Sequence, residues 1–309
     1  MDKDDRFRNR LKRQKNMTRK KRKRKRKKKT IKQKQCSPKN KKESLDYSCY
    51  KPSMLRKMKN IWNKKHPDIE IKSNNLKDIW NSLGYYMKNT CSSEACWIKN
   101  SLFKNNFSEK EMKNIFAPKQ PEDWKKNPNE WLSSIEILEL MKQYEDAYKC
   151  FEFIGPTPID FDEQLAYGKC VWQELCTFNL EEKIKKGVKK IGIIFNLDPH
   201  DKSGSHWTAM FINIKLKKIY YFDSYGDDLT PKRIHVLAER IQEQSKKIGK
   251  KFKFIINKTR HQYTRSECGM YCLFFIIQMI KDVPFSRFTK KVGDKYMRRL
   301  RNIYFNKER

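Results

Sequence analysis

Four residues in the second half of the chain have the side-chain types that a thiol-dependent hydrolase uses. They are His206, Asp223, Gln262 and Cys268, in that order along the sequence. A cysteine nucleophile needs an imidazole to pair with its sulfur, a group that orients the imidazole, and hydrogen-bond donors for the oxyanion. Gln262 lies in a polar loop six residues before Cys268. Its side-chain amide and the Cys268 backbone N–H could therefore hold an oxyanion together.

Cys268 is expected at the start of a buried helix. The segment 268–280 is apolar on nearly every side, so it must lie inside the fold. At a helix start, unpaired backbone N–H groups and the positive end of the macrodipole favour an anionic sulfur. We expect Gly269 to let a substrate approach the backbone closely. Cys272, one helical turn later, is interpreted as a structural thiol of the core.

Two apolar segments, 206–214 and 219–224, predict a β-hairpin because a short charged stretch separates them. A two-residue turn between them would place Asp223 opposite Met210. The step from 206 to 210 is even, so His206 and Asp223 share one face of the hairpin. The same register leaves the two residues roughly 13 Å apart along the ladder, at about 3.3 Å per residue. A bulge, twist or bend must then bring them together.

Each of these residues also has a common structural explanation. A cysteine in an apolar helix usually packs in the core, a histidine at a strand end usually only forms hydrogen bonds, and an aspartate before Ser-Tyr-Gly often forms a turn. Among the other histidines, His200 and His261 are alternative candidates for the base, whereas His66 and His235 are expected to be structural. The ordered set of four residue types therefore carries the hypothesis, and no single member does.

The elements around these residues predict an α+β catalytic domain over 129–309. The chain has 309 residues with 37% hydrophobic content, enough for one substantial core or two small ones, so neither a small disulfide scaffold nor a fully disordered chain fits. Residues 155–158 (GPTP) are expected to form a loop. The remaining periodic segments predict helices at 129–144, 162–187 and 231–248, and strands at 191–197 and 252–257.

Residues 1–45 are strongly basic, with 23 Lys and Arg against 4 Asp and Glu, and they hold more than half of the net charge of +36. Such a segment repels itself, so we expect a disordered arm. The arm could attract nucleic acid or an acidic protein, act as a nuclear-localisation signal, or remain a solvated tail. Residues 46–115 predict a helical accessory domain of unassigned role, and 116–128 a connector.

The cysteine count and the hydropathy restrict the environment of the protein. Nine cysteines with irregular spacing fit a reducing compartment better than a disulfide framework. No CxxC-type pair is present, so we expect no zinc site, and nothing in the sequence implies another cofactor. The sequence contains no run of about 18 apolar residues, so no membrane span is predicted. The N-terminus is charged where a secretory signal would be apolar. The expectation is a soluble protein that is not secreted.

Three segments resemble the ubiquitin-like-protein-processing cysteine proteases, the superfamily of adenovirus protease and the SUMO proteases. They are SHWTAMFI (205–212), YYFDSYG (220–226) and QYTRSECGMYCLFF (262–275). The resemblance covers about 129–285 and implies a papain-like core, in which a central mixed sheet is flanked by helices and the nucleophile begins a buried helix. It implies His206 as base, Asp223 as its orienting carboxylate, Gln262 in the oxyanion hole and Cys268 as nucleophile.

The resemblance also suggests a substrate channel. The segment EWLSS (130–134) is similar to the one that opens the catalytic domain in this superfamily, where two tryptophans commonly clamp a Gly-Gly sequence in a narrow tunnel. Trp131 and Trp207 match them. Two flat rings leave room only for residues without a Cβ atom, which agrees with Gly-Gly recognition. The alternative is that both are aromatic residues of the core.

Within the superfamily, the basic arm, helical region and truncated core look like the processing proteases of large DNA viruses of the African swine fever virus type. Glu267 stands where cellular SUMO proteases usually carry aspartate, which favours the viral branch. The resemblance implies a cysteine endopeptidase that matures viral structural or core polyproteins after Gly-Gly, in the virion and host cytoplasm. The basic run adds the nucleus as an alternative location. The alternatives are a deSUMOylase or deubiquitinase acting on host conjugates, and a basic nucleic-acid-binding virion protein with a vestigial site.

Overall fold

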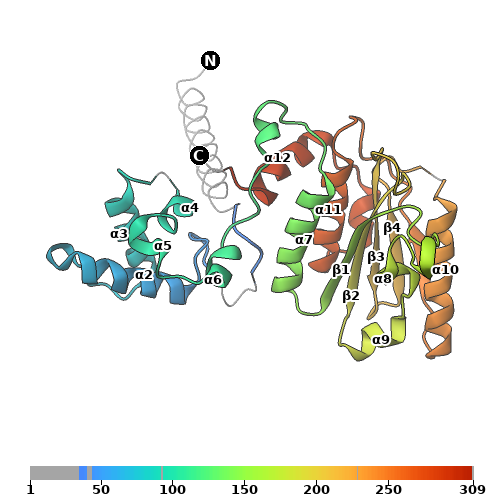
Figure 1. The fold of residues 1–309 in the computed structure, drawn as a ribbon, viewed down its shortest axis with the longest axis horizontal. Helices are drawn as coiled ribbons and strands as arrows, with labels where there is room; N and C mark the ends of the chain where they lie inside the picture. Colours follow the sequence, from blue (N-terminus) through green and yellow to red (C-terminus); the bar gives the residue numbers. More distant parts are fainter. Residues whose placement is uncertain (1–34, 40–43, 92, 228, 308–309) are drawn as a thin grey trace, which may run out of the picture. The chain divides into compact units, whose positions relative to one another are not determined.

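A computed structural model describes residues 35–39, 44–91, 93–227 and 229–307. Their contacts divide the chain into two compact units (Figure 1). The first unit ends at Phe116, and the second begins at Ala117 except that it also includes residues 38–40. Most of the expected basic arm lies outside the described residues. Within its described part, the Ser37 backbone N–H donates to the carbonyl of Ile115 (3.1 Å), so Ser37 is tied to the end of the first unit.

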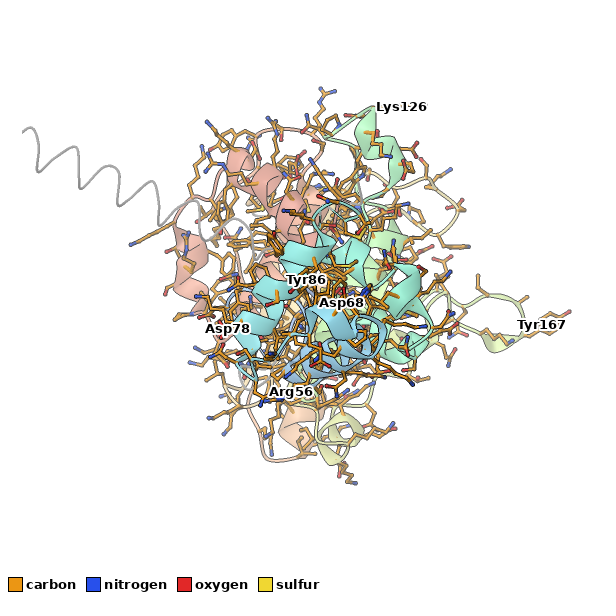
Figure 2. All side chains as sticks on the ribbon, turned by 90° about the vertical axis from the view of Figure 1, so that its left-hand side faces the viewer. Arg56, Asp68, Asp78, Tyr86, Lys126 and Tyr167 are labelled. Atoms are coloured by element: carbon orange, nitrogen blue, oxygen red, sulfur yellow. A yellow bond between two sulfur atoms is a disulfide. The ribbon has the colours of Figure 1, made fainter. Side chains whose placement is uncertain are left out.

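The first unit is helical, as its amphipathic segments predict. Its elements are α2 (Pro52–Lys65), η1 (Pro67–Ile69), α3 (Leu76–Met87), α4 (Glu94–Trp97), α5 (Ser101–Lys104) and α6 (Glu109–Lys113). Leu55, Met58, Leu83 and Phe103 are fully buried in a core of their own. Figure 2 looks onto this unit, where charged side chains such as those of Arg56, Asp68 and Asp78 cover the surface.

Six of the nine cysteines form disulfides, so the expectation of a reduced set is wrong. The pairs are Cys36–Cys49, Cys91–Cys96 and Cys170–Cys176. The free thiols are those of Cys150, Cys268 and Cys272. Turns within short intervals bring the paired Cα atoms to 5.1–6.3 Å, inside the range that a disulfide spans. Irregular spacing along the sequence does not reveal such turns.

The second unit contains a mixed five-stranded sheet, which confirms the predicted fold class. Its strands are β1 (Phe151–Pro158), β2 (Lys190–Asn196), β3 (Trp207–Asn213), β4 (Lys218–Phe222) and β5 (Lys253–Ile256), in the spatial order β1-β2-β3-β4-β5. The outer pairs β1·β2 and β4·β5 are parallel, whereas β3 pairs with both neighbours in the antiparallel sense. Every residue of β3 is buried, as expected for a strand covered on both faces.

Helices cover both faces of this sheet (Figure 1). Alternate residues of β3 point to opposite sides, so Phe211 packs with one core and Met210 with the other. The Phe211 side holds α7 (Ser134–Ala147), α11 (Cys268–Ile280) and α12 (Asp294–Tyr304). The Met210 side holds α8 (Gln173–Cys176), α9 (Leu180–Lys185) and α10 (Lys232–Lys247). The 3-10 turns of this unit are η2 (Glu122–Lys125), η3 (Ala166–Gly168) and η4 (Phe285–Thr289).

Two segments differ from their predicted structure. The expected loop 155–158 is the second half of β1, because an edge strand tolerates Pro156 where the register with β2 shifts. The expected helix over 162–187 is replaced by η3, α8 and α9 with turns between them. Tyr167, at the tip of this stretch, has a positive φ of 63° and projects into solvent (Figure 2).

The helix expected at 129–144 begins later than predicted. Ser133 caps α7, with its side chain and that of Glu136 forming a capping box. The buried face therefore carries Ile137, Leu140 and Met141, whereas Ile135 is 64% exposed. No helix among the described residues is long and apolar enough to cross a membrane.

Candidate active site

The register of the β3–β4 hairpin determines how close His206 and Asp223 come to each other. Ala209 pairs with Phe222, so the next rung sets Thr208 opposite Asp223. The predicted opposition of Asp223 and Met210 is wrong by two residues, because the connection between the strands is longer than a two-residue turn. Side chains alternate between the two faces of a strand, so a register error of two residues leaves every side chain on its predicted face. It also brings the aspartate two residues nearer to the histidine, and no bulge is needed.

His206 and Asp223 form a direct pair at the ends of β3 and β4. The Nε2 atom of His206 lies 2.7 Å from Oδ1 of Asp223, and both side chains are buried. The same carboxylate oxygen accepts a hydrogen bond from the backbone N–H of Tyr225 (2.9 Å). The Tyr225 ring stacks on the imidazole with ring centroids 4.5 Å apart and an interplanar angle of 17°. The imidazole is thus held at its edge by a carboxylate and across its face by a phenol ring.

Cys268 completes this arrangement from the other side of the imidazole. It is the first residue of α11, its thiol is free, and it is buried. Burial lowers the pKa of His206, but hydrogen bonds to Asp223 and Cys268 and the negative charges of both outweigh this effect and raise the pKa to about 9. Since Nε2 faces Asp223, Nδ1 is left for the sulfur. The imidazole is positively charged at neutral pH and can stabilise an anionic sulfur.

Gln262 is buried between the loops that follow β4 and β5. Its side-chain oxygen accepts from the Ser224 hydroxyl (2.6 Å), and its amide nitrogen donates to the Thr264 carbonyl (2.6 Å). A glutamine amide has two N–H groups, so one donor remains after the bond to Thr264. The backbone N–H of Cys268 lies in the first turn of α11, where no intrahelical acceptor exists. These two groups can supply the donors of an oxyanion hole.

The loops that carry Asp223 and Gln262 are tied together by backbone and side-chain contacts. The carbonyl of Ser224 accepts from the backbone N–H groups of both His261 (2.8 Å) and Gln262 (2.9 Å). The Asn257 amide donates to the Asp223 carbonyl (2.9 Å). Gly226 has a φ of 68°, and a Cβ there would lie 2.4 Å from the carbonyl carbon of Thr259. The site is therefore preorganised by close packing of two loops.

The alternative bases lie in other surroundings. The Nδ1 atom of His261 accepts from the backbone N–H of Val292 (3.1 Å), and burial lowers the pKa of His261 to about 4. His200 lies in the connection between β2 and β3, and its Nδ1 atom is 2.6 Å from Oδ2 of Asp160. His200 thus has a carboxylate partner, as His206 does, but the charged groups that act on His200 are Asp160, Asp201 and Glu163, whereas those that act on His206 include Cys268. Outside the site, His66 stacks on Trp62 and His235 packs edge-on against Phe254.

Trp131 and Trp207 line the same pocket, whose volume is about 630 Å³. Trp131 is 39% exposed, whereas Trp207 is buried and donates its indole N–H to the Leu132 carbonyl (2.9 Å). The structure thus brings the two tryptophans to one cavity. The expectation that Gly269 admits a substrate stays a prediction, and packing gives a second reason for this glycine: a Cβ there would lie 2.9 Å from the Cβ of Leu132 and 3.3 Å from the Trp207 ring. The absence of a side chain at Gly269 therefore lets the start of α11 pack closely against Leu132 and the Trp207 ring.

Sequence reasoning did not anticipate a buried ion pair next to the nucleophile. Glu267 is fully buried, and its carboxylate lies 3.1 Å from Nε of Arg301 and 3.8 Å from Nε of Arg298. Burial raises the pKa of Glu267, while Arg301 acts in the opposite direction. Arg301 also donates to the Ser266 carbonyl (3.2 Å) and lies 4.6 Å from the centroid of Trp124. A carboxylate at the start of an all-apolar helix was the signal that such a counter-charge had to exist.

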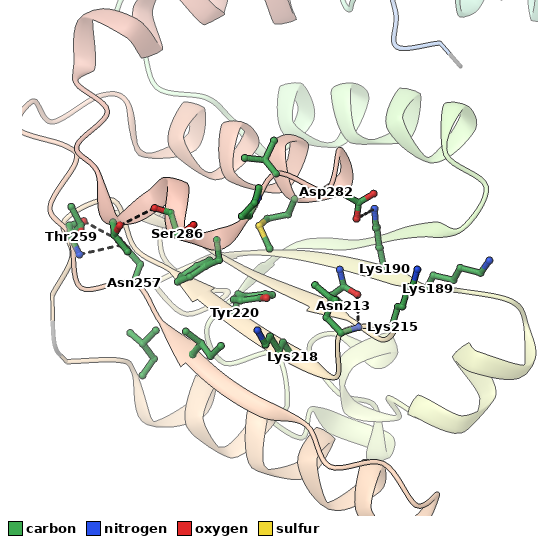
Figure 3. Close-up of a pocket in the computed structure, with 18 of the residues that line it drawn as sticks. Lys189, Lys190, Asn213, Lys215, Lys218, Tyr220, Asn257, Thr259, Asp282 and Ser286 are labelled. Carbon is green, nitrogen blue, oxygen red and sulfur yellow. Dashed lines mark hydrogen bonds and ion pairs between the residues drawn. The ribbon is translucent and has the colours of Figure 1, made fainter. Parts of the chain in front are cut away.

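A larger cavity, about 1060 Å³ in volume, lies between β5 and the segment 282–289 (Figure 3). Figure 3 shows lysines at one end of it and Asn257 and Thr259 at the other. Lys190 is paired there with Asp282 at 2.8 Å. None of the six residues expected at the site lines this cavity.

No group of three His, Cys, Asp or Glu side chains in the described part of the chain is arranged to hold a metal ion.

Comparison with known proteins defines the family. Residues 136–309 match the Ulp1 protease family, C-terminal catalytic domain, and the match covers more than half of the chain. The chain therefore belongs to the Ulp1 protease family, and its class is that of the thiol proteases. A relative in Acanthamoeba polyphaga mimivirus, protein R355, is named as a thiol protease and is 34% identical over 180 residues. That alignment covers 58% of this chain and 58% of the mimivirus protein, less than two thirds of its length.

Three further comparisons come from African swine fever virus. A cysteine protease of the isolate Tick/Malawi/Lil 20-1/1983 is 25% identical over 231 residues, which cover 70% of this chain and 83% of that protein. The crystal structure of an African swine fever virus protease superposes with a TM-score of 0.63 at 20% identity, covering 89% of this chain and 96% of that one. The selenomethionine form of the viral protease gives a TM-score of 0.60 at 22% identity, covering 90% of this chain and 98% of that one. These structures share the fold.

Proposed function

We propose that the second unit is a cysteine endopeptidase that cleaves polypeptides after Gly-Gly. The observation that carries the proposal is the 2.7 Å pair of His206 and Asp223, with Cys268 at the start of a buried helix on the other side of the same imidazole. A thiol, an imidazole and a carboxylate in this order form the constellation of nucleophilic acyl transfer. Membership of the Ulp1 protease family supports the same chemistry.

In the proposed reaction, the Cys268 thiolate attacks the carbonyl carbon of the second glycine. The Gln262 amide and the Cys268 backbone N–H hold the oxyanion, and the His206 imidazolium donates its proton to the departing amine as the C–N bond breaks. A thioester remains. The neutral imidazole then removes a proton from water, which attacks the thioester. The C–S bond breaks, the carboxylic acid leaves, and the Cys268 thiolate and the His206 imidazolium are regenerated. Asp223 keeps the ring in position and stabilises its charged form.

The tryptophan pocket supports the choice of Gly-Gly. Trp131 and Trp207 line a cavity whose wall also includes Gly204. The Trp207 ring lies beside Gly269, the residue directly after Cys268, where an added Cβ would be 3.3 Å from the ring. A chain that reaches Cys268 through this pocket passes between aromatic faces, where a residue without a Cβ fits best.

The proposed substrates are structural or core precursors of a virus, with the virion and the host cytoplasm as the places of action. Relatives in mimivirus and African swine fever virus support this choice. The alternative substrates, ubiquitin-like conjugates of the host, also end in Gly-Gly. Offering a Gly-Gly-X precursor and a ubiquitin-like conjugate to the same enzyme separates the two. Preference for the conjugate would overturn the precursor assignment.

The basic residues 1–45 support a further part of the proposal, in which they concentrate the enzyme on nucleic acid or on an acidic precursor. Deletion of residues 1–34 leaves Cys36 and its disulfide intact. Retention on DNA and its dependence on salt should both decrease in this variant. Equal retention at low salt would remove the arm from the proposal.

The central experiment replaces one free cysteine at a time. Cys268→Ser should lower kcat/KM on a Gly-Gly-X peptide by roughly a thousandfold or more, because serine is a poor nucleophile without its own activation. Cys150→Ser is the matched control, since Cys150 is also a free thiol but lines the other cavity. It should keep the activity of the natural sequence. Wild-type turnover by a folded Cys268→Ser variant would refute the proposal.

A further inference from the structure

Aromatic and cationic side chains form a stacked row that begins at the imidazole. The Tyr225 ring covers His206 at 4.5 Å between centroids. The guanidinium carbon of Arg260 lies 5.7 Å from the Tyr225 centroid and 4.9 Å from that of Tyr263. Lys291 follows, with its Nζ atom 3.6 Å from the Tyr263 centroid. Two cations thus alternate with two phenol rings in a continuous surface beside the site.

The stacked row is fixed to the same loops that carry the site. The backbone N–H of Tyr225 donates to Asp223 (2.9 Å), and Nε of Arg260 donates to the carbonyl of Gln262 (3.1 Å). Gly226 packs against the backbone of Arg260, where a Cβ would lie 2.5 Å from the nitrogen. The guanidinium therefore keeps one position relative to the imidazole, which is a requirement for selecting among substrates.

The loop that supplies Arg260 and Tyr263 is positively charged, whereas the loop that supplies Tyr225 continues with the exposed carboxylate of Asp227. Residues 257–266 contain Lys258, Arg260 and Arg265 and no acidic residue. Both arginines are exposed. The carboxylate of Asp294 is occupied behind the row, because it accepts hydrogen bonds from the Tyr263 backbone N–H (3.1 Å) and from the Tyr271 hydroxyl (3.0 Å). A substrate that lies along the row meets guanidinium groups and aromatic faces.

The chemistry decides which part of the substrate lies there. The departing amine takes its proton from the imidazole, so it must come within hydrogen-bond distance of His206. The residues that follow the scissile bond therefore leave the site along His206 and Tyr225, while the Gly-Gly side is directed to the tryptophan pocket. We propose, on the basis of the proposed function, that the stacked row binds the residues directly after Gly-Gly and selects acidic side chains there.

The test uses three quenched fluorescent peptides that share one Gly-Gly segment and continue with Glu-Glu, Gln-Gln or Lys-Lys. The full chain should cleave the Glu-Glu peptide with a kcat/KM about fivefold to thirtyfold above that of the Lys-Lys peptide at low salt, since each exposed ion pair contributes modestly. Added salt should reduce this ratio. The ratio does not depend on the fraction of active enzyme, so partial misfolding of a variant does not affect it.

Variants assign the selectivity to the row. The double variant Arg260→Gln/Arg265→Gln should reduce the ratio to about twofold or less. Arg260→Lys should retain most of it, because the charge remains. Lys246→Gln/Lys247→Gln is the matched control, since it also removes two positive charges but lies at the end of α10. The topology places that end opposite to the one that carries Asp223, so the ratio should not change.

The outcomes separate this inference from the function on which it rests. Equal cleavage of all three peptides, or a ratio that survives the double variant, would overturn the inference and leave the endopeptidase intact. Failure of the full chain to cleave any of the three would refute the proposed function and the inference with it.

Discussion

His206 and Asp223 are seventeen residues apart in the sequence, yet Nε2 of the imidazole lies 2.7 Å from the carboxylate. The two residues stand at neighbouring strand ends, one just before β3 and one just after β4. This pairing leaves Nδ1 for Cys268, and Asp223 and Cys268 together raise the pKa of His206 to about 9 against the effect of burial. It makes the state of one imidazole the main source of pH dependence.

The first prediction concerns the alkaline limb of the pH profile. The imidazolium that pairs with the sulfur exists below a pH of about 9 and is lost above it, so kcat/KM should fall as the pH rises through this value. Asp223→Asn removes the carboxylate that raises the pKa. The limb should then move to lower pH, with a smaller loss of activity than in Cys268→Ser. An alkaline limb that stays in place in Asp223→Asn would contradict the assignment.

The second prediction concerns the oxyanion donors. Gln262→Ala should lower kcat by roughly a hundredfold or more with little change in KM, because the lost hydrogen bond forms mainly in the transition state. Ser224→Ala removes the hydroxyl that positions the Gln262 carbonyl, and it should cause a smaller loss. Steady-state kinetics on a Gly-Gly-X peptide measure both. A larger effect of Ser224→Ala than of Gln262→Ala would exclude a donor role for the glutamine.

The third prediction tests how closely α11 packs against Leu132 and the Trp207 ring. Gly269→Ala places a Cβ 2.9 Å from Leu132, so the free energy of unfolding should fall by about 1–3 kcal/mol, the usual cost of overpacking. Gly293→Ala is the control, because a Cβ there has no neighbour within 4 Å. Its free energy of unfolding should change far less. Urea denaturation of the two variants would show equal stability if the glycine were present only for substrate access.

The fourth prediction concerns the buried ion pair of Glu267 and Arg301. Removing one partner leaves a buried charge without compensation, so Glu267→Gln and Arg301→Met should each cost about 3–5 kcal/mol. The double variant should cost clearly less than the sum, because neither charge remains. Thermal or urea denaturation of the four proteins completes the double-mutant cycle. Strict additivity would show that the two side chains do not interact.

The fifth prediction counts thiols. Alkylation of the denatured, unreduced chain should modify three cysteines, those of Cys150, Cys268 and Cys272. Prior reduction should raise the number to all nine. Mass spectrometry of the intact protein gives both numbers. Modification of all nine cysteines without a reductant would show that the three disulfides are absent, as the sequence led us to expect.

Local apolar patterns predicted the main elements of the second unit. The helix expected at 268–280 coincides with α11, because a segment that is apolar on all sides has no alternative to burial. The strands expected at 206–214 and 219–224 lie within a residue or two of β3 and β4 at each end. The side-chain faces of the hairpin were also predictable, since they depend only on parity.

Features that depend on tertiary context were not predictable. The register of the hairpin depends on the turn, and the length of a charged turn is ambiguous. Pro156 was interpreted as a loop residue because its place in an edge strand depends on the order of strands. Glu267 was noted only as a departure from the usual aspartate, since its partner Arg301 is 34 residues away. The row from Tyr225 to Lys291 likewise joins three separate segments.

The position of Arg301 in α12 has a consequence for the order in which the protein matures. During translation, Glu267 and Cys268 emerge from the ribosome before the helix Asp294–Tyr304 that supplies the counter-charge. Until that helix docks, burying the carboxylate beside the nucleophile is unfavourable, so the start of α11 cannot settle into its final place. Docking of α12 is therefore a folding requirement for the segment that begins at Glu267.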